Sequence, residues 1–425
     1  MQDLDEILIE LGMHPDCVVL DDCARQFADA MAEGLKGNRT GMQMLPTYIS
    51  AEGQVPRNEK IIVMDAGGTN FRRAVAWFND DGELVLDQFE IYPMPGTWGE
   101  MRLNAFFDQI ADYIMPIIKE SDKICFCFSY ATDALPNRDG RLQRFCKEVQ
   151  VRDSEGIEVC AELKKALRRN GVMEEKDCVL INDSVAALLG GKAVAGEQDY
   201  DSWVGYIYGT GLNACYVEKN ANIAEVGGDG EMIVNMEAGM HIGFPMGEAD
   251  RLLDEDSELP GDHMFEKMVA GGYLGRVMAL TALLLSERGL FSHDAAHALR
   301  RVEAFTLADI GEFLDGGEFQ NGEDDPIAGM DEQDREILLT LCDRLYERAA
   351  KLVVLSIGAV LTHIGKEKMV CCTMEGTTFR KSRKFREHFF RLGQEYLQEQ
   401  LGVCPVFLEC EDTTLTGTAI AGLLN

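Results

Sequence analysis

The chain has 425 residues, 46% hydrophobic and 27% charged, a composition typical of a well-packed globular protein long enough for two domains. Its formal net charge of −33 would repel phosphate backbones and anionic lipid, so we expect neither nucleic acid nor a membrane as a partner. A small anionic substrate would have to be held by local backbone amides, a few cations and a metal ion.

Cysteine usage and the N-terminus indicate a cytoplasmic protein. The thirteen cysteines include no C-x-x-C pair, which argues against a zinc site and a disulfide framework. Cys125, Cys127 and Cys178 lie in apolar segments, where thiols behave as small hydrophobes. The opening MQDLDEILIELGM is acidic where a signal peptide would be basic. The apolar stretch 353–364 is too short to span a bilayer and predicts a buried helix.

The predicted elements occur twice in the same order. Two helical faces open the chain, formed by Leu4, Ile7, Leu8 and Leu11, then by Cys23, Phe27 and Met31. The first half then predicts strands at 61–64, 72–78 and 83–92, a helix at 103–120, a strand at 123–131, a helix at 158–169, a strand at 178–182 and a helix from Ser184. The second half predicts strands at 203–208, 213–218 and 231–237, a long helix from near Glu266, further helices to about 364, a strand at 368–374, a helix at 384–399, a strand at 404–410 and a helix at 417–424. Such a duplication predicts two α/β domains with a ligand cleft between them.

Two glycine turns occupy corresponding places in the two halves. The first, at 65–72, reads DAGGTNFR and lies between two apolar strands. Gly67 and Gly68 can adopt positive φ and leave the backbone bare for a phosphate, although Gly-Gly is also ordinary in a hairpin. The second turn is 209–211, and the pair favours a phosphate clamp shared by two lobes. Neither a P-loop nor a dinucleotide fingerprint is present.

Asn182 and Asp183 follow an apolar strand and precede a helix. Phosphoryl transfer to an alcohol requires a carboxylate that accepts the hydroxyl proton, and α/β folds commonly place ligand chemistry at strand ends. Asp183 is equally suited to cap the helix, so this segment alone leaves both readings open. Asn213, Glu237 and Glu266 are further polar residues near strand ends or a helix start. His293 and His297 lack the glutamate of a zincin motif.

Several ordered motifs resemble the hexokinase/glucokinase family of the actin-like ATPase fold, from about Met44 to the C-terminus. They are MLPTYI at 44–49, DAGGTNFR at 65–72, IND at 181–183, GTGLNACYVE at 209–218, NMEAG at 235–239, FEKMVAGGYLG at 265–275 and EGTTFRK at 375–381. The resemblance implies two actin-like (ribonuclease H-like) lobes, each a five-stranded mixed sheet with helices, separated by a cleft. It also implies a small lobe at 59–184, a large lobe at 185–408 joined by helices at 1–58, and a C-terminal helix at 409–425 that returns to the small lobe.

The resemblance also implies the roles of individual residues. Asp183 and Lys147 are the expected catalytic residues, with Asp183 as the base that takes the proton of the sugar 6-hydroxyl. The expected sugar-binding residues are Ser129, Cys146, Lys147, Asn182, Asp183, Asn213, Glu237 and Glu266. The expected ATP-binding residues are Asp65, Gly67, Gly68, Thr69, Asn70, Arg72, Thr210, Gly211, Gly376, Thr377, Thr414 and Gly417. Asp65 is expected to hold Mg²⁺ through water.

Some positions depart from the family pattern. Cys146 stands where the family has a sugar-binding threonine, and Ala238 replaces a tryptophan. A thiol is a weaker hydrogen-bonding group, and beside Lys147 it would favour the thiolate if exposed; alternatively, it faces the core. The family's C-terminal G-S-G reads Thr413-Thr-Leu415, and its F-S-F-P-C reads 128-FSYAT-132.

We therefore expect a cytoplasmic hexokinase that uses Mg-ATP to phosphorylate the 6-hydroxyl of a hexose, with glucose the expected sugar and a monomer or homodimer the expected assembly. Two alternatives remain at this point. A non-catalytic sugar-responsive regulator would keep the fold without the chemistry, and an actin-like ATPase would turn over ATP without sugar.

Overall fold

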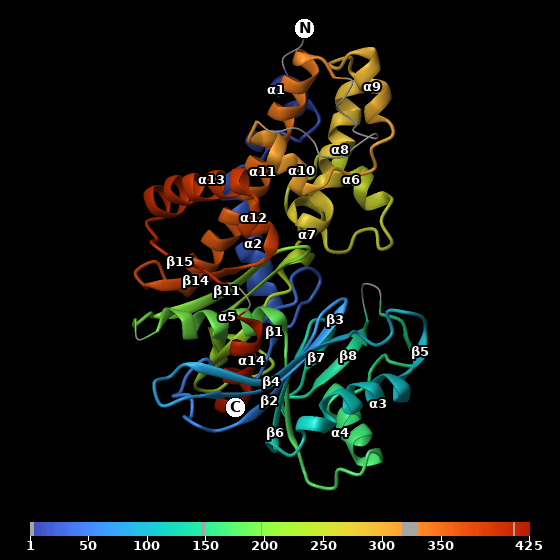
Figure 1. Cartoon of the computed structure of the whole chain (residues 1–425). Helices are drawn as coiled ribbons and strands as arrows, with labels where there is room; N and C mark the ends of the chain where they lie inside the picture. The colour runs from blue at the N-terminus through green and yellow to red at the C-terminus, as the bar shows by residue number, and fades with distance from the viewer. Residues whose placement is uncertain (1–3, 146–148, 197, 317–329, 411–412) are drawn as a thin grey trace.

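Two mixed β-sheets organise the chain (Figure 1). The computed structural model describes residues 4–145, 149–196, 198–316, 330–410 and 413–425. One sheet has five strands in the order β10-β6-β2-β3-β4, and the other has six in the order β1-β13-β12-β11-β14-β15. The first sheet is built from β2 (Ile61–Ala66), β3 (Asn70–Phe78), β4 (Leu84–Pro93), β6 (Lys123–Phe128) and β10 (Asp177–Ile181). The second is built from β1 (Leu45–Pro46), β11 (Ser202–Tyr208), β12 (Leu212–Lys219), β13 (Glu231–Asn235), β14 (Val370–Glu375) and β15 (Val406–Glu409).

The two-fold repetition of strand order is confirmed, with one correction. Each half begins with an antiparallel meander, β2-β3-β4 or β11-β12-β13, and then adds parallel strands beside its first strand. The second sheet has six strands rather than five because Leu45 and Pro46 pair with β13 at its edge. A strand of two residues is too short for a period of alternating side chains to be seen in the sequence, so this pairing could not be predicted.

The N-terminal helices pack onto the six-stranded half. α1 (Leu4–Glu10) and α2 (Leu20–Leu35) bury the apolar faces predicted for them, and α2 lies against α11 (Glu332–Ile364). The apolar stretch 353–364 is the C-terminal part of α11 and is largely buried, as predicted. Within the described residues, every helix is too short or too polar to cross a bilayer.

Two helices lie between the sheets (Figure 1). α5 (Asp183–Ala195) is buried from Ser184 to Gly191, and α14 (Thr414–Leu424) packs against α5 and against β2 and β6. Glycine makes these contacts possible. A Cβ at Gly417 would lie 1.8 Å from the Ala186 carbonyl oxygen, and one at Gly191 would lie 2.0 Å from the Thr373 hydroxyl. α5 is therefore fixed between the two sheets by backbone contact.

Further α-helices occur in both halves of the chain. They are α3 (Leu103–Ile114), α4 (Val159–Arg169), α6 (Glu248–Glu255), α7 (Met264–Val269), α8 (Gly271–Glu287), α9 (His293–Leu299), α10 (Leu307–Leu314), α12 (Thr377–Lys381) and α13 (Arg383–Leu392). The helix predicted at 103–120 ends early, since Pro116 lies in a 3₁₀ turn. The helix predicted at 384–399 becomes a π-helix from Gly393 to Gln400. Four short strands, β5 (Met101–Arg102), β7 (Ala131–Ala134), β8 (Gly140–Arg144) and β9 (Val151–Arg152), were not predicted.

The long helix predicted from Glu266 is wrong, because it breaks after one and a half turns. Ala270 is extended, with ψ of 154°, and separates α7 from α8. Gly271 and Gly272 then donate their backbone N–H groups to the carbonyls of Gly209 and Thr210 at 2.9 Å each. A Cβ on either glycine would come within 2.8 Å of those carbonyl oxygens. The break thus docks α8 against the second glycine turn.

A buried ion pair joins α6 to α11. Arg348 and Asp250 have side chains only 2% and 1% exposed, and two guanidinium nitrogens donate to the two carboxylate oxygens at 3.2 and 2.5 Å. Asp250 also accepts the backbone N–H of Gly247 at 2.7 Å, which caps α6. Removing one partner of such a pair leaves a buried charge without compensation.

We predict that Arg348→Met lowers the free energy of unfolding by about 3–5 kcal/mol, because Asp250 loses its counter-ion in the interior. Urea denaturation followed by circular dichroism measures the change. Arg169→Met is the control: it removes an exposed pair with Asp108 and should cost less than about 1 kcal/mol. Equal losses in the two variants would contradict the prediction.

Candidate functional site

At the junction between β10 and α5, the residue that caps the helix and the candidate catalytic residue are two different residues. The side-chain oxygen of Asn182 accepts the backbone N–H of Ser184 at 2.9 Å and its hydroxyl at 2.8 Å. Asn182 is therefore the N-cap, and Asp183 is the first residue of the helix. The reading of Asp183 as the cap is wrong, so its half-buried carboxylate is left for another role.

Asn235, which ends β13, connects the polar residues of the site. Its amide nitrogen donates to Glu237 Oε1 at 2.7 Å. Its carbonyl oxygen accepts from the Asn213 amide at 2.9 Å and from the Ser184 hydroxyl at 3.3 Å. The side chain is only 5% exposed, so these bonds lie inside the fold. Asn235 thereby ties β12, β13 and the start of α5 together.

Glu237 and Glu266 bring two further carboxylates to this region. Burial raises the pKa of Glu237, and the charges of Asp183 and Glu266 add to the rise, whereas Asn235 and His263 oppose it. Glu266 accepts the backbone N–H of Leu212 at 2.8 Å. The structure thus brings five predicted sugar residues close together, each at or near the end of a strand or the start of a helix. They are Asn182, Asp183, Asn213, Glu237 and Glu266.

Two glycines make room for Glu266. A Cβ on Gly211 would lie 2.7 Å from Glu266 Oε2, and one on Gly239 would lie 2.8 Å from the Leu212 carbonyl oxygen and 3.1 Å from Glu266 Cβ. The second glycine turn therefore borders the carboxylate cluster while its carbonyls bind α8. The predicted phosphate-binding roles of Thr210 and Gly211 stay predictions.

The first glycine turn joins β2 to β3. Gly67 donates its backbone N–H to Asn70 at 3.1 Å, and its φ lies outside the left-handed region, so the bare backbone rather than positive φ is what it contributes. Asp65, 8% exposed, lies across from Arg72, with Nη1 3.9 Å from Oδ2. Asn70 donates its side-chain amide to the Thr69 hydroxyl at 3.2 Å.

Ser129 directly follows β6 and lies next to this turn. Its backbone N–H donates to the Ala66 carbonyl at 3.3 Å, and the hydroxyl of Tyr130 donates to the Gly67 carbonyl at 2.7 Å. Tyr130 stands where the family pattern has phenylalanine, so its hydroxyl is an addition that braces the turn.

Three carboxylates lie around Cys127, each near the C-terminal end of a strand. Burial raises the pKa of the Cys127 thiol, and the charges of Asp65, Asp183 and Glu375 raise it further. Asp65 is the last residue but one of β2, Asp183 lies two residues after β10, and Glu375 ends β14. Glu375 accepts a hydrogen bond from the hydroxyl of Thr413 at 2.9 Å. Thr413 stands where the family motif has glycine. Glu375 was not predicted as a site residue, although it begins the EGTTFRK motif.

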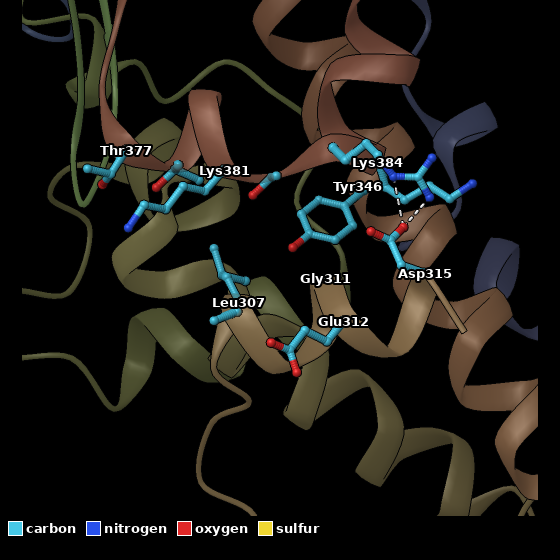
Figure 2. A pocket seen from close by; sticks show the side chains of 12 residues that line it. Leu307, Gly311, Glu312, Asp315, Tyr346, Thr377, Lys381 and Lys384 are labelled. Carbon is cyan, nitrogen blue, oxygen red and sulfur yellow. Dashed lines mark hydrogen bonds and ion pairs between the residues drawn. The ribbon is translucent and has the colours of Figure 1, made fainter. Parts of the chain in front are cut away.

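A pocket of about 430 Å³ opens beside Gly376 and Thr377 (Figure 2). Its walls come from α10, α11 and the α12–α13 segment, through Leu307, Ala308, Gly311, Glu312, Asp315, Tyr346, Thr377, Thr378, Lys381, Ser382, Arg383 and Lys384. Gly376 has φ of 123°, and a Cβ there would lie 2.3 Å from the Tyr208 carbonyl oxygen. The sequence predicted only the Thr377 wall, because the α10 wall carries no motif.

Four more residues were predicted to belong to the sugar or ATP site. Cys146 and Lys147 lie outside the described residues, so their predicted roles stay predictions. Gly417 is buried against α5, and helix packing accounts for it as a glycine. Thr414 lies 3.5 Å from Glu375 Oε1 through its hydroxyl.

The fold and the site define a two-lobed α/β protein with paired glycine turns and a carboxylate cluster at the strand ends. Two family profiles described as Hexokinase match residues 203–424 and 5–193. The chain therefore belongs to the hexokinase family.

Individual proteins show the extent of the similarity. Hexokinase-3 of Mus musculus is 28% identical over 418 residues, which cover 93% of this chain and 44% of that protein. Hexokinase-1 of Schizosaccharomyces pombe is 26% identical over 432 residues, covering 94% of this chain and 86% of that protein. The solved hexokinase of Schistosoma mansoni complexed with glucose superposes with a TM-score of 0.82 at 21% identity, over 100% of this chain and 99% of that one. The chain thus spans less than half the length of the mouse relative.

We predict that Asn235→Ala raises the KM for the sugar by about tenfold or more, since Glu237 and Asn213 each lose a buried hydrogen-bond partner. Steady-state kinetics with saturating ATP measure the change. Asn220→Ala, at a partly buried side chain whose amide nitrogen donates to the Asp229 carbonyl, is the control and should leave KM unchanged. A normal KM in folded Asn235→Ala would contradict the proposed organising role.

We also predict acid sensitivity from His241. Its ring is 3% exposed, has no hydrogen-bond partner at either nitrogen, and packs on Phe27 and Phe244. Burial lowers its pKa to about 4 from 6.5. Between those values the folded protein binds fewer protons than the unfolded chain, so stability falls as the pH falls from 6.5 toward 4, by about 3 kcal/mol in total.

Urea unfolding across this pH range tests the sign and the size. His241→Phe keeps a ring against Phe27 and should remove this part of the slope. His293→Phe is the control, because the His293 side chain is 95% exposed. An unchanged slope in a folded His241→Phe protein would contradict the assignment.

Proposed function

We propose that this chain is an ATP-dependent hexokinase that phosphorylates the 6-hydroxyl of a hexose, with glucose the expected sugar. The observation that carries the proposal is the β10–α5 junction. Asn182 takes the capping bond, and the adjacent Asp183 lies with Glu237 and Glu266 where a polyol could be held. Membership in the hexokinase family and the glucose complex of the Schistosoma mansoni relative support the same chemistry.

The sugar would be held by carboxylate and amide groups that are already oriented. Asn235 fixes Glu237 and Asn213, while the Leu212 N–H fixes Glu266. A hexose that lacks one of the expected hydroxyls would leave a buried carboxylate or amide unpaired. The site would then disfavour that hexose much more strongly than it would if only an apolar contact were lost. Such a site should therefore discriminate among hexoses.

The donor set near the first turn fits a magnesium ion carried by ATP. Mg²⁺ prefers oxygen ligands and keeps much of its water, and Asp65 supplies a largely buried carboxylate near the end of β2, just before the turn that carries the Thr69 hydroxyl. When bound, the ion would neutralise charge on the phosphates. Arg72, Thr210 and the two glycine turns would contact the phosphate groups, and the adenosine would extend toward the pocket beside Thr377.

The reaction would proceed by in-line displacement. The sugar O6 forms a bond to the γ-phosphorus while the bond from that phosphorus to the β,γ-bridging oxygen breaks, which releases ADP. The O6 proton passes to the Asp183 carboxylate and afterwards leaves to solvent. Arg72 lies beside Asp65 on the first turn, where its guanidinium can offset phosphate charge. Exclusion of water would prevent hydrolysis of ATP in place of transfer.

We propose two lobes with boundaries close to those expected from the sequence. Residues 59–184 and the C-terminal helix form the small lobe, and residues 1–58 and 185–408 form the large one. The packing of α14 on β2 and β6 supports the return of the C-terminus. Because β15 extends to Glu409, the last boundary is better drawn after residue 410. Cytoplasmic location and assembly as a monomer or homodimer stay predictions.

A panel of hexoses separates this proposal from its alternatives. Release of ADP from Mg-ATP should depend on a hexose and should yield a sugar 6-phosphate. An actin-like ATPase would release ADP without sugar, and a regulatory protein would bind sugar without releasing ADP. Either result would overturn the proposed activity.

We predict that Asp183→Ala lowers kcat by at least about 10², as expected for loss of a general base, while sugar affinity weakens only modestly. Single-turnover kinetics and calorimetric sugar titration separate the two effects. Asp177→Ala, at the exposed start of the same strand, is the matched control and should keep kcat. Near-normal turnover in Asp183→Ala would remove the residue from the chemistry.

A further inference from the structure

An ion pair connects the small-lobe strand β8 to the loop before α7. Nη2 of Arg144, the last residue of β8, lies 3.0 Å from Oδ2 of Asp262. The two residues are 118 positions apart in sequence, and their side chains are 43% and 26% exposed. Burial alone would raise the pKa of Asp262, but the bond from Arg144 and the charges of His263 and Arg144 outweigh it and lower that pKa. The pair is thus a charged contact between parts of the fold that carry different sheets.

Asp262 is directly attached to the helix that carries Glu266. Its Oδ1 accepts the backbone N–H of His263 at 3.0 Å and lies 3.0 Å from the His263 ring nitrogen Nδ1. His263 holds the N-terminal position of α7 with φ of 51°, a conformation that is uncommon outside glycine. Glu266 lies in the first turn of that helix, four residues after Asp262.

The loop before α7 is braced as one unit with the helix. The ammonium of Lys267 binds Asp254 at 2.6 Å, the Ser257 hydroxyl at 2.9 Å and the Leu259 carbonyl at 2.7 Å. Asp254 also accepts the backbone N–H of Gly261 at 3.0 Å. A displacement of Asp262 is therefore expected to move α7 with it.

We propose that the Arg144–Asp262 ion pair is a latch that stabilises the arrangement of the two lobes seen in this structure and positions Glu266 relative to Asp183 for the sugar. The inference rests on the proposed hexokinase function. Arg144 is a positioning residue, because it acts through Asp262 and α7. A half-exposed pair of this kind contributes modestly and is screened by salt, so its effect should be a several-fold change that high ionic strength removes.

The variants Arg144→Gln and Asp262→Asn test the latch by removing one charge at nearly constant side-chain size. Each should raise the sugar KM by about threefold to fivefold with kcat within about twofold of the native value. The double variant should be no worse than either single one, because both remove the same contact. Arg144→Lys keeps the charge and should retain most of the native KM. Arg169→Gln breaks the exposed Arg169–Asp108 pair within the small lobe and should change none of these values.

Two further measurements distinguish a latch from a general structural effect. Raising the salt concentration should increase the KM of the native protein but not that of Arg144→Gln. Small-angle scattering of the sugar-free protein should give a larger radius of gyration for Arg144→Gln than for the native chain. A KM and a radius of gyration equal to those of Arg169→Gln would overturn the latch, as would a loss of kcat at unchanged KM.

The scattering comparison needs no turnover. If the native protein phosphorylates no hexose, the proposed function fails, and the radius of gyration of Arg144→Gln still decides whether the ion pair holds the lobes together.

Discussion

The hydrogen bonds from Ser184 to the side chain of Asn182 determine how the rest of the site is arranged. They end β10 and start α5 in a single step, and they let the neighbouring carboxylate of Asp183 serve another purpose. α5 is buried from Ser184 to Gly191 and lies between the two sheets, so its start cannot shift independently of either one. The Ser184 hydroxyl also reaches Asn235, which orients Asn213 and Glu237. A chain of hydrogen bonds therefore connects the cap of α5 to the groups that would hold the sugar.

Absent side chains shape this site as much as present ones. Gly211 and Gly239 leave the space that Glu266 occupies, and Gly271 and Gly272 let α8 bind the carbonyls of the second turn. Gly376 lies against the Tyr208 carbonyl, which brings the pocket wall at Thr377 next to the same turn. Each of these contacts is backbone to backbone or backbone to carboxylate, and each would be blocked by a single methyl group. This explains why glycine occurs at and around the second turn without a P-loop arrangement.

Much of the fold could be predicted from the sequence because strands and amphipathic helices leave periodic patterns. The order of elements, the buried N-terminal faces and the buried part of α11 all followed from such patterns. The break at Ala270 could not, since it depends on docking to Gly209 and Thr210, which are 60 positions away in the chain. The same holds for the two-residue strand β1. Short pairings and breaks of this kind are decided by tertiary contacts.

The candidate site was predictable where residues form motifs and not where they are joined by distant contacts. Asp183, Glu237 and Glu266 were predicted, yet the sequence left open whether Asp183 caps α5. Asn235 and Glu375 were missed as site residues, because their importance lies in bonds to other strands. The α10 wall of the pocket is similarly formed by a segment without a motif.

The division of roles between Asn182 and Asp183 is the central claim, and unfolding free energies test it most directly. Asn182→Ala removes the cap and should cost about 1 kcal/mol or more, as measured for helix caps in other proteins. Asp183→Asn should cost little, because the lost interaction with the helix dipole is offset by relief of repulsion from Glu237. The account predicts this order of effects in urea denaturation at neutral pH. A larger loss of stability in Asp183→Asn than in Asn182→Ala would contradict it.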